Sequence, residues 1–207
     1  MAVKNHEMDT ILADAAMKEF LTYGYNDASL RRIADAAGTT TGSVYMRYEN
    51  KDKLFCSLTD CIVEETEKAF EELKPLYMSC GTLEDMMKAT ETESDMILRI
   101  IFEHYDAATL LLCKSEGSSA ATFFEDLIRR KIQESESFFA YLPRSEDLLH
   151  ALDVLLTVQF DMYRQILKNG YTETQAHNCM KIMMKFMNGG WNTVMRDFLK
   201  EKGEIHQ

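Results

Sequence analysis

The 207-residue sequence is short of residues that interrupt regular backbone, with only two prolines and nine glycines. It also lacks the alternation of β-branched and polar residues that is typical of half-buried strands. No apolar run approaches the roughly 20 residues that a membrane-spanning helix needs. What remains is dense in Leu, Met, Ala, Glu and Lys, which predicts a soluble, all-α protein. Its length allows one large helical domain, or a small domain joined to a larger one.

Cysteine pairs are also missing. The five cysteines are an odd number without CxxC spacing: Cys56, Cys61, Cys80, Cys113 and Cys179. Because the N-terminus does not resemble a signal peptide, we expect reduced thiols in a cytoplasmic protein, with a redox switch as the alternative. The spacing matches no zinc site, and we expect neither a metal nor a cofactor.

The sequence signatures of common enzymes are absent. There is no glycine-rich phosphate loop, no GxSxG nucleophile elbow and no HExxH zinc motif. The pairs Glu103 with His104 and His177 with Cys179 lie one or two positions apart on predicted helices, so their side chains point in different directions. We therefore expect no enzyme. An unrecognised enzyme stays a third hypothesis, which turnover assays would test.

Positive charge is scarce overall, and its distribution is uneven. The formal net charge is −11, yet residues 1–55 hold seven Lys and Arg against eight Asp and Glu. Residues 56–207 hold sixteen against twenty-six, whereas residues 31–53 hold five basic and three acidic side chains. A locally positive segment on an acidic chain favours binding to a specific DNA site and opposes indiscriminate DNA coating.

Apolar periodicity divides the chain into nine predicted helices, over residues 9–23, 30–36, 40–46, 51–73, 83–104, 107–113, 120–141, 146–168 and 173–200. Residues that begin or end helices support these boundaries. They are Gly24 and Pro75 as stops, Ser29 and Asn50 as N-caps, and Thr172 with Gln175 as a capping box.

The most informative pattern lies in residues 29–55, SLRRIADAAGTTTGSVYMRYENKDKLF. Small alanines at 34, 36 and 37 allow two short helices to approach closely, and Gly38 accepts the positive φ that a tight turn between them often demands. Short hydroxyl side chains then gather at the start of the second helix, where they can reach base edges or phosphates. This pattern predicts a helix-turn-helix that enters a DNA major groove.

In order and spacing, about residues 9–55 resemble the TetR family of transcriptional regulators. The matching segments are 10–16, 24–25, 29–34, 37–38, 41–45 and 50–55. The resemblance implies that DNA is contacted by Arg31, Thr40, Thr41, Gly42, Ser43 and Tyr45, and that Lys51 contacts a phosphate. Tyr48 lies three residues after Tyr45, on a neighbouring position of the same face, and is either a further DNA contact or a core ring.

Three positions depart from the family pattern. Thr39 stands where the family usually has an apolar β-branched residue, and its hydroxyl needs a partner such as the backbone at a helix start. Met46 stands where a polar or aromatic residue often contacts DNA, and Arg47 where histidine is frequent. The base preference of this chain therefore does not follow from its relatives.

The last two predicted helices carry wide apolar stripes at helical spacing. They predict a dimer interface made by Leu152, Leu156, Met180, Met183, Met187, Trp191, Val194 and Phe198. The dipeptide Gly189-Gly190 would allow two helices to cross closely, although a monomeric core with a glycine kink is the alternative. The family resemblance implies a four-helix interface, with two helices from each subunit.

The resemblance also implies that the body holds a small-molecule effector, whose binding alters the separation of the two DNA-binding heads. Residues that could line its site are Ile97, Arg99, Ile100, Glu103, His104, Phe123, Phe124, Leu127, Phe160 and Tyr163. Each apolar member is more often ordinary core than part of a ligand pocket. Arg99, Glu103 and His104 are the polar candidates for orienting the effector.

Together these patterns predict an N-terminal three-helix DNA-binding domain over residues 1–50 and a larger helical domain over 51–207 that binds the effector and dimerises. We expect a homodimeric transcriptional regulator, a repressor that the effector releases from a pseudo-palindromic operator in double-stranded DNA. Its two recognition helices would lie about 34–36 Å apart. The alternative is a helical sensor or carrier of small molecules that no longer binds DNA. Effector, operator and regulated genes cannot be read from the sequence.

Overall fold

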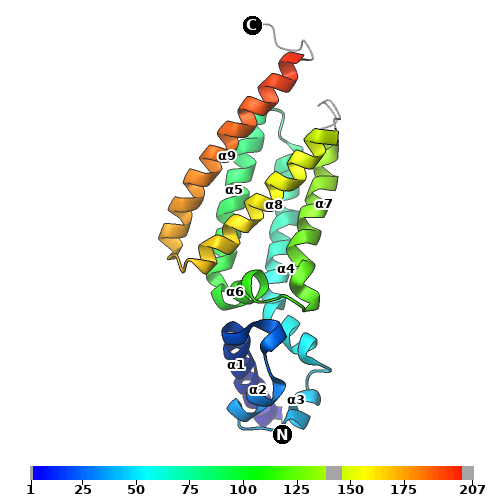
Figure 1. Cartoon of the computed structure of the whole chain (residues 1–207), viewed down its shortest axis with the longest axis vertical. Helices are drawn as coiled ribbons and strands as arrows, with labels where there is room; N and C mark the ends of the chain where they lie inside the picture. The colour runs from blue at the N-terminus through cyan, green and yellow to red at the C-terminus, as the bar shows by residue number, and fades with distance from the viewer. Residues whose placement is uncertain (1, 139–145, 202–207) are drawn as a thin grey trace. The chain divides into compact units, whose positions relative to one another are not determined.

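The structure is a computed structural model that describes residues 2–138 and 146–201. Within these residues the chain forms nine α-helices and one 3-10 helix without a β-strand (Figure 1), which confirms the all-α prediction. The helices are α1 (Ala2–Asp27), α2 (Leu30–Ala36), α3 (Thr41–Tyr45), α4 (Lys51–Met78), α5 (Leu83–Glu103), α6 (Tyr105–Cys113), η1 (Ser119–Thr122), α7 (Phe123–Phe138), α8 (Glu146–Lys168) and α9 (Glu173–Glu201). None of them, in this described part, combines the length and apolar character required to cross a membrane.

The chain divides into two compact units. The head unit comprises residues 1–67 and 100–123, and the body unit comprises residues 68–99 and 124–207. The division differs from the boundary near residue 50 that the sequence suggested. The reason is packing: α6, far along the chain, contacts α1 and η1, and the start of α4 contributes Leu54 and Phe55 to the same core as α1.

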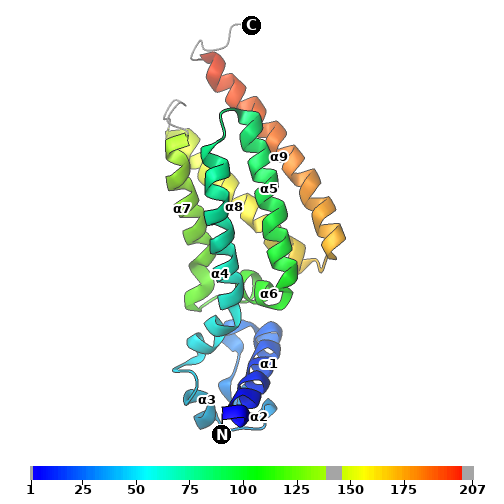
Figure 2. The same ribbon diagram turned by 180° about the vertical axis from the view of Figure 1, so that it is seen from behind.

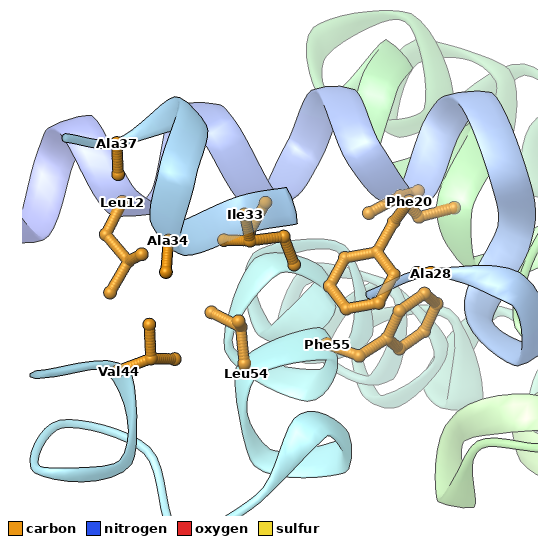
Figure 3. Packing of buried hydrophobic residues seen from close by; sticks show 11 residues of the cluster. Leu12, Phe20, Ala28, Ile33, Ala34, Ala37, Val44, Leu54 and Phe55 are labelled. Atoms are coloured by element: carbon orange, nitrogen blue, oxygen red, sulfur yellow. The ribbon is translucent and has the colours of Figure 1, made fainter. Parts of the chain in front are cut away.

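The head core joins side chains from five helices, and Figure 3 shows how several of them pack. Its buried members are Leu12, Ala16 and Phe20 of α1, Ile33 and Ala34 of α2, Val44 of α3, Leu54 and Phe55 of α4, and Leu110 of α6, with Ala28 and Ala37 from the connections. The rings of Phe20 and Phe55 meet edge to face with centroids 5.0 Å apart. Burying each such ring contributes roughly 1.5–3 kcal/mol, so these contacts hold the short helices α2 and α3, which would not be stable alone.

Two glycines shape the connections of the head as the sequence predicted. Gly24, at φ 74° and ψ 172°, breaks the regular geometry of α1 three residues before its end. Gly38, at φ 65°, forms the turn between α2 and α3. A residue with a Cβ is strained in this left-handed region, so both turns favour glycine.

The predicted N-caps have different outcomes. The Asn50 side chain accepts a hydrogen bond from the Lys53 backbone N–H at 2.8 Å, which confirms its role at the start of α4. Ser29 occupies the N-cap position of α2, but its side chain makes no capping bond. Instead the buried Glu19 carboxylate accepts the Ser29 backbone N–H at 2.8 Å and the Arg32 Nε at 2.8 Å. A side chain from α1 therefore organises the start of α2.

The sequence suggested that Pro75 ends α4, but the helix continues to Met78. Proline removes one backbone N–H and crowds the preceding turn, but the carbonyl of Pro75 still accepts the N–H of Ser79 at 3.1 Å. The helix is also held beyond the proline, because the hydroxyl of Tyr77 donates to the Glu93 carboxylate of α5.

The body unit contains the end of α4 and most of α5, together with α7, α8 and α9, which form a helical bundle (Figures 1 and 2). Phe160 of α8 contacts Phe70 of α4 and Phe124 of α7, with ring centroids 6.5 and 5.9 Å away. The predicted capping box at the start of α9 is confirmed: Thr172 and Gln175 exchange hydrogen bonds between backbone N–H groups and side-chain oxygens at 2.9 and 3.3 Å.

Candidate functional site

The short helix α3 follows the Gly38 turn and is packed against the head through the buried Val44. Thr40 is its N-cap, since Oγ1 accepts a hydrogen bond from the Ser43 backbone N–H at 3.2 Å. The N-cap is therefore Thr40 and not the neighbouring Thr39, the residue whose hydroxyl needed a partner. Used this way, the Thr40 oxygen is engaged as an acceptor while its hydroxyl proton stays available as a donor.

The outer face of α3 is open to solvent. Gly42 and Tyr45 are exposed, and Met46, directly after the helix, is 87% exposed. Arg31 of α2 is also exposed, and its nearest carboxylate, Asp35, is 3.9 Å away. Thr41 and Ser43 are half-buried. Exposed hydroxyl, guanidinium and apolar groups are the groups that contact phosphates, base edges and thymine methyls in DNA.

Arg47 is fixed by a network inside the head. Its Nε donates to Asp9 Oδ1 of α1 at 2.6 Å, and its Nη1 donates to both the backbone carbonyl and the Oγ of Ser43, at 3.2 and 2.8 Å. Because the Ser43 oxygen accepts this charged donor, the hydroxyl proton is directed to another acceptor. Sequence reasoning identified Ser43 but missed Asp9, which lies 38 positions before Arg47.

Lys51 lies at the start of α4, where its charge is unfavourable for the helix dipole. The sequence interpretation was that a phosphate would compensate. In the structure the Lys51 ammonium instead donates to three carbonyl oxygens at the end of α1 and just beyond: those of Tyr25 at 2.7 Å, Asn26 at 3.2 Å and Ala28 at 3.3 Å. The Tyr25 ring centroid lies 4.5 Å from the same nitrogen. The ammonium thus caps the end of α1.

Tyr48, for which the spacing left two roles open, packs against the head core and is half-buried. This placement corresponds to the role of a core ring. Tyr45, three residues earlier, is exposed. One turn of backbone therefore separates a tyrosine available to a partner from one that supports the fold.

Residues 114–119, which lead into η1, contact both the end of α1 and the start of α4. The Lys114 carbonyl accepts the Tyr25 N–H at 2.9 Å, at the kink of α1. Asp52 of α4 accepts hydrogen bonds from Ser119. Burial would raise the pKa of Asp52, but these hydrogen bonds and the Lys53 charge outweigh burial and lower it. Residues 114–119 therefore help to position α1 and α4, the helices that flank α2 and α3.

Comparison with known proteins agrees with this geometry. Residues 12–58 match the family model of bacterial regulatory proteins of the tetR family, and this range contains α2, the Gly38 turn, α3 and the start of α4. Residues 12–58 are therefore similar to the helix-turn-helix segment of the TetR family. Over 82 residues, or 39% of this chain, the sequence is 35% identical to the HTH-type transcriptional repressor Rv1474c of Mycobacterium tuberculosis. The match spans 41% of the length of that curated relative.

Solved structures resemble a larger part of the chain. A TetR-family transcriptional regulator from Chloroflexus aurantiacus superposes with a TM-score of 0.61 at 16% identity, covering 89% of this chain and 93% of that one. The regulator FadR from Bacillus subtilis, solved in complex with stearoyl-CoA, gives a TM-score of 0.56 at 13% identity, covering 84% and 96%. At such identities the likeness establishes the fold alone, a small helical region followed by a larger one.

The apolar surface of α8 and α9 differs from the predicted dimer interface. Met180 is only 1% exposed and lies inside its own body unit, which corrects its assignment to a surface. Leu156, Met183, Met187 and Trp191 are half-buried and Val194 is exposed, whereas the side chains of Leu152 and Phe198 lie outside the described ones. The most exposed apolar residues on these helices, which the sequence analysis missed, are Val154, Val158, Ile182 and Phe186.

Polar contacts between α9 and α5 explain why the side of α9 that carries Ile182 and Phe186 is exposed. His177 and Asn188 of α9 point toward α5, where His177 Nδ1 lies 3.4 Å from an Asp95 carboxylate oxygen and Asn188 donates to Glu91 at 3.2 Å. Ile182 and Phe186 lie one turn apart and are 72% and 81% exposed. A sequence stripe as wide as this one does not reveal which edge meets the core.

The predicted effector residues fall into both units. Ile97, Phe124, Leu127, Phe160 and Tyr163 are buried in the body unit, and Ile100 is buried in the head unit. Phe123 is half-buried in the head unit. Of the polar candidates, Arg99 and Glu103 are exposed, and His104 is paired with Glu65, its Nε2 3.0 Å from the carboxylate. Among the described residues of the body unit, the buried polar side chains lie elsewhere, at Glu93 and Ser94 of α5 and Gln159 of α8.

Sequence analysis missed Glu93, although a signal existed. Glu93 lies four residues after Ala89 and four before Ile97, both buried, so helical spacing places its carboxylate on the apolar stripe of α5. A charged residue at such a position is rare in proteins unless it has a partner. Tyr77 supplies a hydrogen bond to it.

Proposed function

We propose that this protein is a homodimeric DNA-binding transcriptional regulator, a repressor that a small-molecule effector releases from a pseudo-palindromic operator. The observation that carries the proposal is the open face of α3, where exposed Tyr45 and Met46 adjoin a helix whose start is capped by Thr40. The similar protein Rv1474c is named a transcriptional repressor, which supports the direction of control. A protein that binds DNA in this way would act in the cytoplasm, and we propose no catalytic activity.

The DNA contacts proposed are those of Arg31, Thr40, Thr41, Gly42, Ser43 and Tyr45. Arg31 and Tyr45 suit phosphate contacts, since both are exposed and carry hydrogen-bond donors. Met46 suits apolar contact with a thymine methyl group. For Lys51 we propose an indirect role, because its three N–H groups already hold carbonyls of the head.

A second copy of the chain is the proposed partner of the exposed apolar side chains of α8 and α9, which are Val154, Val158, Ile182, Phe186 and Val194. Large apolar side chains exposed in number on two helices favour an interaction surface. One recognition helix makes few contacts, and useful specificity normally requires two half-sites presented by a dimer.

The test begins with selection of binding sites from a random DNA pool by the purified protein. We expect a pseudo-palindromic site whose affinity falls steeply with salt, because phosphate contacts release counterions. Tyr45→Phe should weaken this binding severalfold. A small-molecule screen for release of the best site then identifies effectors.

The second candidate function is a sensor or carrier of small molecules without DNA binding, supported by the resemblance of the chain to FadR, solved with stearoyl-CoA. Absence of any selected DNA site, together with retained ligand binding, would decide for this candidate.

A further inference from the structure

Arg47, two residues after the end of α3, links α3 to α1 within the head unit. Its hydrogen bonds include one from Nε to Asp9 Oδ1 of α1 at 2.6 Å and one from Nη1 to the Ser43 Oγ at 2.8 Å. The Arg47 side chain is 21% exposed and that of Asp9 is 45% exposed. Hydrogen bonds from a charged donor are the strong ones, and partial shielding from water strengthens them further. Asp9 and Arg47 therefore control the surroundings of the Ser43 hydroxyl.

The chemistry of arginine decides how the Ser43 hydroxyl is used. A guanidinium has five N–H donors, no acceptor, and keeps its proton in proteins. The Ser43 oxygen can therefore only accept from Arg47, and this charged bond polarises the hydroxyl toward donation. Within the described part of the chain, Ser43 donates its proton to no protein group. Ser43 consequently offers a hydrogen-bond donor to a partner that lies against α3.

The neighbouring hydroxyl of Thr40 has the same polarity. Its Oγ1 accepts the Ser43 backbone N–H at 3.2 Å, and its proton likewise has no acceptor among the residues that the structure describes. The two residues are three positions apart, and their side chains are thus neighbours on the surface. Thr40 is exposed and Ser43 is half-buried. Two adjacent hydroxyl groups therefore present protons, while protein donors already occupy their oxygens.

The four bases differ in what they offer to such donors in the major groove. Guanine presents two acceptors, N7 and O6, and thymine presents the acceptor O4. Adenine presents N7 beside an amino group that donates, and cytosine presents only an amino donor. A hydroxyl held as a donor is therefore matched by guanine and opposed by cytosine, because two donors that face each other leave both hydrogen bonds unmade. A serine that turns freely can donate or accept and would distinguish these bases poorly.

We propose that Asp9 and Arg47 are positioning residues that hold Ser43 as a hydrogen-bond donor, and that Ser43 thereby selects a base with an acceptor and rejects cytosine. Guanine is the favoured base, since its two acceptors match the hydroxyls of both Thr40 and Ser43. This inference rests on the proposed function, in which α3 is the helix that enters the major groove and reads base edges. Asp9 and Arg47 act through Ser43 and need no contact with the base.

The test starts from the operator half-site that the purified full-length protein selects from a random DNA pool. Ser43→Ala identifies the position that Ser43 reads, because base preference should be lost there and kept at the other positions. At that position the wild type should bind guanine about tenfold more tightly than cytosine. Removal of the acceptor, with 7-deazaguanine for N7 and 2-aminopurine for O6, should weaken wild-type binding severalfold and leave the binding of Ser43→Ala unchanged.

Two variants with opposite effects on charge then assign the preference to the positioning residues. Arg47→Met removes the donor that holds Ser43, so the preference for guanine over cytosine should fall severalfold. Because a positive charge is lost, affinity for all DNA should fall as well. Asp9→Ala releases Arg47 and should relax the same preference, but it should raise affinity for all DNA because a negative charge is lost. A merely structural role would change affinity without changing the preference at one position.

Arg129→Met is the matched control for the loss of charge. Arg129 belongs to the body unit, is 67% exposed and donates to Asp126 at 2.8 Å. This variant should leave the base preference at every position unchanged. If Arg47→Met does not fold, Asp9→Ala, together with the analogues on the wild type and Ser43→Ala, decides.

An unchanged preference in folded Arg47→Met or in Asp9→Ala would overturn the positioning role of that residue. A cytosine at the position that Ser43 reads, or an effect of Ser43→Ala that is coupled to a methylphosphonate linkage and to no base analogue, would overturn the selection of a base acceptor. These outcomes leave the proposed function intact, because a DNA site is still selected. Failure to select any DNA site would instead remove the proposed function and this inference with it.

Discussion

The Asp52 carboxylate at the start of α4 accepts two hydrogen bonds from Ser119, one from its backbone N–H at 2.8 Å and one from its hydroxyl at 2.6 Å. The two residues are 67 positions apart, and both belong to the head unit. The contact joins the start of η1 to the start of α4 within the head unit. Any movement of Ser119 would therefore be transmitted to α4, the helix that follows α3.

This contact predicts acid sensitivity. Because the folded-state pKa of Asp52 is lowered, its stabilising effect is present above the unfolded value of about 3.9 and is lost as the pH falls through the folded value. We expect the wild type to lose more stability between pH 5 and pH 3 than Asp52→Asn does. Urea denaturation at both pH values is the measurement. Identical losses in the two proteins would contradict it.

Gly117 approaches the end of α1 so closely that a side chain does not fit. A Cβ there would lie 2.0 Å from Asn26 Oδ1, and its φ is +87°. Gly117→Ala should therefore destabilise the protein by about 1–3 kcal/mol, measured by urea denaturation. The double variant Gly117→Ala with Asn26→Ala should recover part of the loss, because it relieves the clash but keeps the backbone strain. No change in the single variant would refute the close approach.

Substitutions at Lys51 and Tyr45 should distinguish an effect on stability from an effect on DNA binding. Lys51→Ala leaves three carbonyls without their charged donor, so we expect a loss of about 1–3 kcal/mol in the free energy of unfolding together with weaker operator binding. Tyr45→Phe removes only an exposed hydroxyl and should weaken DNA binding with no change in Tm. Neither variant should alter ligand affinity. If neither affects DNA affinity, the proposed DNA contact surface is wrong.

Tyr77 and Tyr163 should differ in their response to loss of the hydroxyl. Tyr77→Phe removes the hydrogen bond to the buried Glu93 and should destabilise the protein by about 1–3 kcal/mol. Tyr163→Phe removes a buried hydroxyl beside the uncharged Ser94 hydroxyl and should cost about 1 kcal/mol or less. Urea denaturation of the two variants is the measurement, and a larger loss for Tyr163→Phe would contradict this expectation.

The exposed face of α8 and α9 should control oligomeric state. Phe186→Asp places a charge at the centre of the proposed interface and should convert a dimer into a monomer, as measured by sedimentation. The control is Thr174→Asp, which adds the same charge at an exposed residue of α9 on a different side of the helix from Phe186, and it should leave the dimer intact. A dimer unaffected by Phe186→Asp would place the interface elsewhere.

The segment from α2 to the start of α4 shows how much of the structure the sequence could predict. The bounds of α2, the turn at Gly38 and the cap at Asn50 were all readable, since each depends on interactions within about four residues. The partner that caps the start of α2 was not readable, because the Ser29 backbone N–H is held by Glu19, ten residues earlier on another helix. The same limit applies to Arg47, whose partner Asp9 lies on α1.

The sequence by itself determined that the chain is helical and carries a helix-turn-helix of TetR type, because capping residues, glycines and apolar spacing act locally. Only the tertiary structure decided that Met180 points inward while Phe186 points outward, that Lys51 caps α1, and that Glu93 lies buried beside Tyr77. Helical periodicity establishes that a stripe is apolar, but packing between segments distant in sequence selects which part of the stripe is covered and which polar groups meet.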